Sequence, residues 1–164
     1  MAQDCCNPIL AGVTAASLPP EIADWFAGRG WRVRQHQMDM LAVSDAGRHA
    51  LLVADTGAGK TLAGFLPTLA AFCPSRIGDG ERPEGLHTLY VSPLKALAHD
   101  VQRNLVTPVE EMGLDIRIET RSGDTPSDRK KRQRKRPPNV LLTTPESLSL
   151  LLSYPESFDL FAGL

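Results

Sequence analysis

Cysteine, net charge and long apolar runs are all scarce in this sequence of 164 residues. Its three cysteines, Cys5, Cys6 and Cys73, show no metal-ligand spacing with histidine, so we expect no structural metal site built on them. Their odd number in a chain of ordinary size fits a reducing compartment and predicts a cytoplasmic protein. A formal net charge of −1 predicts no polyanion partner from the whole-chain balance, so charge must be examined locally.

Apolar runs are too short anywhere in the sequence to span a membrane, and we expect no membrane partner. Residues 1–17 lack the Lys/Arg stretch that opens a signal peptide, and their small residues without a clear period predict a flexible leader. Residues 18–164 suffice for one domain with its own core. Hydrophobic residues make up 42% of the sequence, which indicates a globular rather than a disordered chain.

The most informative segment is Ala-Asp-Thr-Gly-Ala-Gly-Lys-Thr at residues 54–61. The apolar run over residues 49–54 predicts a buried strand, and apolar residues at helical spacing after the segment predict a helix. Strand, glycine-containing loop and helix are the context of a phosphate-binding loop, in which backbone N–H groups and a helix N-terminus face the phosphates. We expect Lys60 to reach the outer phosphates of a nucleoside triphosphate and Thr61 to offer a hydroxyl to Mg²⁺.

Helical and strand patterns alternate along the rest of the chain. Helices are predicted over residues 18–28, 35–45, 94–105, 125–136 and 145–153, with a fresh helix start at Thr107-Pro108, and strands over 86–92, 116–120 and 140–143. Residues 74–85 read as a surface loop, and Thr125 as the cap of the basic helix. This alternation predicts an α/β fold with a mainly parallel sheet.

A dense basic run occupies residues 129–136. It is open to two interpretations: contact with nucleic-acid phosphates, or a solvated helix face whose cations meet carboxylates elsewhere. No aromatic residue interleaves the run, so it offers no stacking platform by itself.

Three polar turns, at residues 92–98, 120–124 and 143–147, follow predicted strands. The carboxyl ends of parallel strands share one edge, so these turns together predict a grip on a nucleic-acid backbone.

Five segments, residues 31–37, 54–61, 93–97, 121–126 and 144–148, follow the order of motifs in a superfamily 2 helicase. The sequence most resembles the bacterial ligase-associated DExH-box helicases, within the large helicase-related group. That resemblance implies a RecA-like P-loop three-layer sandwich and an ATP-dependent DNA translocase with a role in DNA repair. It also implies DNA partners, single-stranded or partly duplex, and repair proteins such as a ligase or a nuclease.

The resemblance further implies roles for individual residues. Gln37 would read adenine, and Thr61 would be the Mg²⁺ ligand. The ATP-binding set would be Gln37, Thr56, Gly57, Ala58, Gly59, Lys60 and Thr61. The residues that grip the tracking DNA strand would be Pro93, Lys95, Arg121, Gly123, Thr144 and Pro145.

Two departures from the family pattern matter. Asp55 stands where the family usually has proline, and a carboxylate there would repel a triphosphate. No acidic Asp-Glu pair follows an apolar strand, although helicases use that pair to hold Mg²⁺ and activate water. We therefore expect residues 18–164 to be a partial N-terminal RecA-like domain, lacking the second such domain and inactive as a hydrolase. The alternatives are a nucleic-acid-binding module with a non-functional phosphate loop and a fragment of a P-loop kinase.

Overall fold

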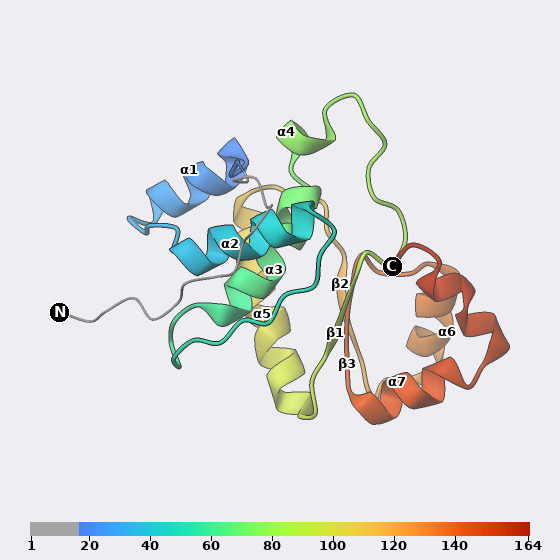
Figure 1. Ribbon diagram of the computed structural model, residues 1–164. Coiled ribbons are helices and arrows are strands. Elements are labelled where there is room, and N and C mark those ends of the chain that lie inside the picture. Colours follow the sequence, from blue (N-terminus) through green and yellow to red (C-terminus); the bar gives the residue numbers. More distant parts are fainter. Residues whose placement is uncertain (1–16) are drawn as a thin grey trace. The chain divides into compact units, whose positions relative to one another are not determined.

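The computed structural model describes residues 17–164 (Figure 1), so the flexible leader predicted for residues 1–17 lies, apart from Ser17, outside the described residues. The chain divides into two compact units, the first ending at Gly78 and the second spanning Asp79–Leu164. No helix within residues 17–164 has the length and apolarity needed to cross a membrane.

The first unit is helical. Its helices are α1 (Pro20–Gly28), α2 (Gln35–Asp45), α3 (Lys60–Ala71) and the short α4 (Pro74–Ile77). Pro20 occupies the first turn of α1, where a missing N–H costs no hydrogen bond. Helix α2 packs against α3 and has the bounds predicted from sequence. The core of this unit is apolar and includes Ile22, Phe26, Leu41, Ala63, Leu66 and Leu69.

The strand predicted for residues 49–54 is wrong. These residues have no strand assignment, and the side chains of Leu51 and Val53 are 90% and 69% exposed. An apolar run becomes a buried strand only when neighbouring strands supply a hydrogen-bond ladder and a covered face. The three strands of the described chain, which all lie after residue 87, pair with one another instead.

The second unit is an α/β layer structure. Its elements are β1 (Thr88–Val91), α5 (Lys95–Glu111), β2 (Ile118–Arg121), α6 (Ser127–Lys135), β3 (Val140–Thr143), α7 (Pro145–Leu152) and the 3₁₀ turns η1 (Pro155–Ser157) and η2 (Asp159–Phe161). The sheet is parallel with order β1-β3-β2, and central β3 is buried at all four residues. Figure 1 shows α5 on one side of the strands and α6 and α7 on the other. The predicted parallel α/β arrangement is confirmed.

Three local predictions were wrong in detail. Helix α5 continues through Pro108 to Glu111, so Thr107-Pro108 does not start a new helix. Buried Leu105 and Val109 continue its packed face on either side, which offsets a proline penalty of about 3 kcal/mol. The hydroxyl of Thr125 accepts a hydrogen bond from the Ser122 N–H (2.9 Å) and does not cap α6. Helix α4 forms the start of the segment predicted as a loop, residues 74–85.

Candidate functional site

The Gly-containing loop of the first unit has the backbone of an anion-binding turn. Gly57 and Gly59 adopt left-handed φ angles of 81° and 77°, which side-chain-bearing residues rarely adopt. The N–H of Ala58 donates to the carbonyl of Asp55 (3.1 Å), and Gly59 caps α3. The first N–H groups of a helix have no intrahelical acceptors, so this turn leads directly into a group of donors suited to an anion.

The Lys60 side chain folds back over the loop that precedes it. Its Nζ donates to the carbonyl oxygens of Ala54 (2.6 Å) and Asp55 (2.7 Å). An ammonium group has three donors, so one remains for a phosphate oxygen in this conformation. Thr56 and Thr61 are both exposed on the same loop and helix start. The described residues hold no group of three or more His, Cys, Asp or Glu side chains that could bind a metal. The role of the Thr61 hydroxyl as a Mg²⁺ ligand stays a prediction.

Gln37 lies against the loop. Its side chain is buried, and its Oε1 accepts a hydrogen bond from the Arg34 N–H (2.9 Å). Its Nε2 sits so near Gly59 that a Cβ added there would lie 3.1 Å away, so a side chain at position 59 would press on the Gln37 amide as well as strain the left-handed backbone. Gln37, Gly57 and Gly59 share an open pocket of about 610 Å³, which half-exposed Trp31 also lines. The structure thus brings the predicted glutamine and the predicted loop into one site.

The candidate nucleic-acid residues lie where the strands of the second unit end. Val91, Thr143 and Arg121 are in register, so the turns that follow β1, β3 and β2 share one edge of the sheet. Of the predicted residues, Pro93, Lys95, Gly123 and Pro145 are exposed, whereas Thr144 is buried and its hydroxyl accepts from the Ser147 N–H at the start of α7.

An ion pair crosses between two of these turns. The Nζ of Lys95 lies 2.7 Å from the Oδ2 of Asp124, and both side chains are exposed. The hydrogen bond from Lys95, together with its charge, lowers the pKa of Asp124. A nucleic-acid phosphate approaching Lys95 would therefore compete with a carboxylate already bound there.

Arg121 is buried rather than offered to solvent. Its guanidinium donates to the Lys130 carbonyl (3.1 Å) and lies 3.4 Å from the Oε1 of Gln133. Burial, and secondly the charge of Arg134, lower the pKa of Arg121. The side chain therefore holds α6 in place through hydrogen bonds to Lys130 and Gln133. Its predicted contact with DNA stays a prediction.

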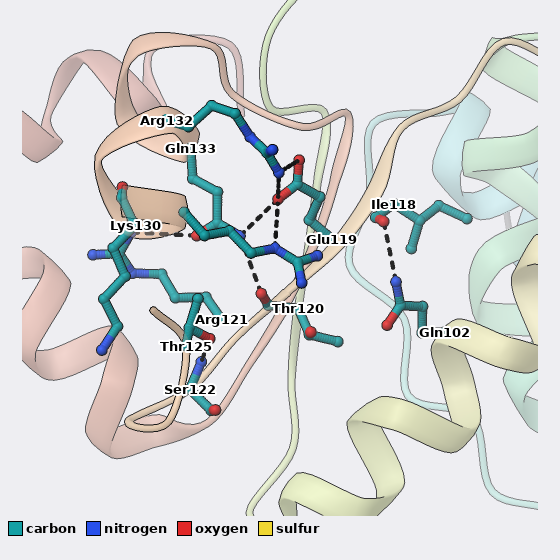
Figure 2. Close-up of polar contacts among 11 residues, drawn as sticks. Gln102, Ile118, Glu119, Thr120, Arg121, Ser122, Thr125, Lys130, Arg132 and Gln133 are labelled. Atoms are coloured by element: carbon teal, nitrogen blue, oxygen red, sulfur yellow. Dashed lines mark hydrogen bonds and ion pairs between the residues drawn. The ribbon is translucent and has the colours of Figure 1, made fainter. Parts of the chain in front are cut away.

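Part of the basic run is neutralised inside the unit (Figure 2). Glu119 accepts from the Nε of Arg129 (3.2 Å), from the Nη2 of Arg132 (3.3 Å) and from the Nε2 of Gln133 (2.9 Å). Gln133 is fully buried and also donates to the Thr120 carbonyl (3.0 Å). Burial raises the pKa of Glu119, but the hydrogen bonds and the charge of Arg132 together hold it below its ordinary value. The sequence offered one signal for this network, since Gln133 is the only uncharged residue of the run.

The sequence matches the DEAD/DEAH box helicase family across residues 34–161, which is most of the chain. The chain belongs to the DEAD/DEAH box helicase family. The match includes the glutamine, the loop and all three strand-end turns. The family membership and the parallel α/β layers of the second unit confirm the predicted RecA-like fold class.

Individual relatives agree with this assignment. The ATP-dependent helicase Lhr-Core of Methanothermobacter thermautotrophicus is 36% identical over 156 residues, covering 89% of this chain and 18% of the relative. The structure of the Mycobacterium smegmatis helicase Lhr bound to ssDNA and AMP-PNP superimposes with a TM-score of 0.72 at 35% identity, covering 90% of this chain and 19% of that one. The structure of the DUF1998 helicase MrfA bound to DNA and AMPPNP gives a TM-score of 0.74 at 28% identity, covering 93% of this chain and 21% of that one.

The chain spans about a fifth of the length of these proteins. They are Lhr-type and MrfA helicases, so they support the predicted helicase family and not the ligase-associated subgroup in particular.

Replacing Glu119 with glutamine is expected to lower the free energy of unfolding at neutral pH by about 1–3 kcal/mol, because Arg129, Arg132 and Gln133 lose a shared charged acceptor. The pKa of Glu119 is lowered in the folded chain, so its contribution is complete above the ordinary value of 4.5 and is lost as pH falls through the lower folded value. Urea unfolding followed by circular dichroism at two pH values measures both effects.

The exposed helical carboxylate Glu110 provides a matched control, since Glu110→Gln should leave the stability within about 0.5 kcal/mol. A difference between wild type and Glu119→Gln that stays constant into strongly acidic solution would contradict the assigned role of the carboxylate.

Proposed function

We propose that this chain provides the nucleotide-binding and part of the nucleic-acid-binding surface of an ATP-dependent DNA helicase or translocase. The observation that carries the proposal is the position of the Gln37 amide beside Gly59, in a pocket that Gln37, Gly57 and Gly59 line together. A purine-reading amide and two glycines of a phosphate-binding turn then line one open pocket, and Lys60 follows Gly59 directly at the start of α3. Support comes from two helicase structures. The Lhr structure is bound to ssDNA and AMP-PNP, and the MrfA structure is bound to DNA and the same nucleotide.

In this proposal each ATP-site residue has a separate task. Gln37 contacts adenine through its amide. The backbone of residues 56–59 surrounds the β- and γ-phosphates, and the ammonium of Lys60 neutralises their charge. Mg²⁺, when bound, would withdraw charge from the phosphate oxygens, and Thr61 is the residue whose hydroxyl would hold it.

The nucleic-acid partner in the proposal is single-stranded or partly duplex DNA. Exposed Pro93, Lys95, Gly123 and Pro145 would contact its backbone at the shared sheet edge. Thr144 would act by fixing the start of α7, and Arg121 by fixing α6. The DNA-repair role, membership of the ligase-associated subgroup, a cytoplasmic site of action, and a ligase or nuclease partner all belong to this proposal.

One alternative has an observation in its favour. Asp55, in place of the usual proline, adds a carboxylate to the loop whose carbonyl groups already bind Lys60. A chain with a non-functional loop would bind DNA but not ATP. Calorimetric titration of ATP into the wild-type chain and into Asp55→Pro distinguishes the two, since only the alternative predicts that the substitution creates binding where none existed.

Reversing the charge of Lys130, Lys131, Arg134 and Lys135 is expected to weaken DNA binding and flatten its salt dependence. The log–log slope should fall by about one unit for every phosphate that the variant no longer binds. The structure directs the choice of residues, because Arg129 and Arg132 are paired with Glu119 and their reversal would also destabilise the unit. Fluorescence anisotropy at several salt concentrations measures the slope.

Arg103→Glu tests whether removing any cation has the same effect, because Arg103 is exposed on α5, away from the basic run. An unchanged slope in the fourfold variant would identify the run as a solubilising face.

A further inference from the structure

Cations of α6 surround a pocket in the second unit that has no part in the proposed ATP site. The pocket has a volume of about 300 Å³ and lies between α6, the start of α7 and Tyr154. Arg121, Lys130, Lys131 and Arg134 all line it, and none of the described residues that line it carries a carboxylate. A pocket with four cations and no anion is an unusual arrangement, because like charges in close proximity repel.

The Glu119 network explains why these cations gather on one side. It pairs Arg129 and Arg132 with a carboxylate and anchors the buried Gln133 to β2. Fixing α6 in this way turns Lys130, Lys131 and Arg134 toward the pocket, whereas the ion pairs that the described side chains of α6 form with a carboxylate are those of Arg129 and Arg132 with Glu119. The Nζ of Lys130 donates to the Gly123 carbonyl (2.9 Å), which places it beside the turn after β2. Burial first, and then the charge of Arg134, lower the pKa of Arg121, and a bound anion would relieve the repulsion between these two guanidinium groups.

An aromatic ring completes the pocket. Tyr154 is 41% exposed, and the guanidinium of Arg134 lies 5.8 Å from the centre of its ring. The hydroxyls of Ser122 and Ser147 also line the cavity and can donate to an anion. Stacking between an exposed aromatic ring and a base tolerates any sequence, since every base has a π-face.

We propose that this pocket is a subsite for one nucleotide of single-stranded nucleic acid, with the phosphodiester held by Lys130, Lys131 and Arg134 and the base stacked on Tyr154. The inference rests on the proposed DNA-binding function and extends it from the strand-end turns, whose Ser122, Gly123 and Ser147 line the pocket, to α6 and Tyr154. A site for free phosphate would need the cations alone. The adjoining half-exposed ring is what favours a nucleotide.

The test uses two labelled strands of equal length, an oligo-thymidine strand and an abasic sugar-phosphate strand, with fluorescence anisotropy of the full chain. The wild type should bind the thymidine strand more tightly. Tyr154→Ala should lose at least about 5-fold in affinity for that strand and almost none for the abasic strand, and Tyr154→Phe should retain the wild-type preference. Lys131→Gln combined with Arg134→Gln should weaken binding of both strands.

Phe158→Ala is the matched control, because Phe158 is an exposed aromatic residue of the same unit that does not line the pocket. Thermal melts of each variant show whether it is folded. If the wild type binds the thymidine strand, and Tyr154→Ala and Tyr154→Phe bind both strands with the wild-type affinity, the subsite is overturned. The proposed DNA binding stands in that case. Equal losses on both strands for Tyr154→Ala would also overturn the base contact. Binding of neither strand by the wild type would overturn the proposed DNA function and the subsite with it.

Discussion

Replacing Lys60 with alanine is expected to abolish measurable ATP binding while leaving the fold nearly unchanged. The ammonium of Lys60 is the only side-chain cation among residues 54–61. Hydrogen bonds to charged groups are worth about 1.5–3 kcal/mol each, so removing one such bond to phosphate weakens ATP binding by roughly 10- to 150-fold. The fold should survive because Lys60 begins α3 without belonging to its buried face. Isothermal titration calorimetry with ATP and Mg²⁺ measures the change.

Lys95→Ala is the matched control, since it removes an exposed lysine from the second unit and should leave ATP affinity as it was. Equal ATP affinity in wild type and Lys60→Ala would contradict the proposed nucleotide site. Absence of binding in both chains would direct attention to Asp55, and the Asp55→Pro variant would then be the informative protein.

Residues 1–164 by themselves are expected to release no phosphate from ATP, with or without single-stranded DNA. Their sequence contains no adjacent Asp-Glu pair, so no such pair positions Mg²⁺ or the attacking water. The arginine finger that the family resemblance assigns to a second RecA-like domain is worth about 10³–10⁵ in rate by analogy with GTPases. A coupled assay for phosphate release measures turnover directly.

The assay should be run at low protein concentration, because exposed Leu51 and Val53 form an apolar segment that invites self-association. Lys60→Ala serves as the blank for contaminating hydrolases. DNA-stimulated turnover by the wild type that disappears in Lys60→Ala would refute the prediction and identify Asp55 or Asp124 as the acid to replace next.

Local sequence patterns were sufficient where neighbouring residues decide the conformation. Helix α2 has its predicted bounds, and β3 spans the four residues predicted for it. The same holds for the turn at Gly57 and Gly59, whose left-handed backbone follows from a glycine pattern. The alternation of helices and strands then led to the parallel sheet, because parallel strands need helical crossovers.

Patterns were misleading where a partner distant in sequence decides the outcome. Residues 49–54 are as apolar as a buried strand, yet a strand also needs paired neighbours, and a single segment carries no information about them. Pro108 looks like a helix start, but the packed face of α5 continues past it.

The sequence by itself determined the helicase family, the glycine turn at residues 57–59 and the order of the α/β elements, because each depends on short segments and on their order along the chain. Only the tertiary structure decided how the basic run is used. It pairs Arg129 and Arg132 with Glu119, and it brings Tyr154 beside Arg134, although no aromatic residue lies within the run. Charge pairing and ring contacts act through space over a few ångströms, so they depend on how β2, α6 and the residues after α7 pack, which one-dimensional spacing does not specify.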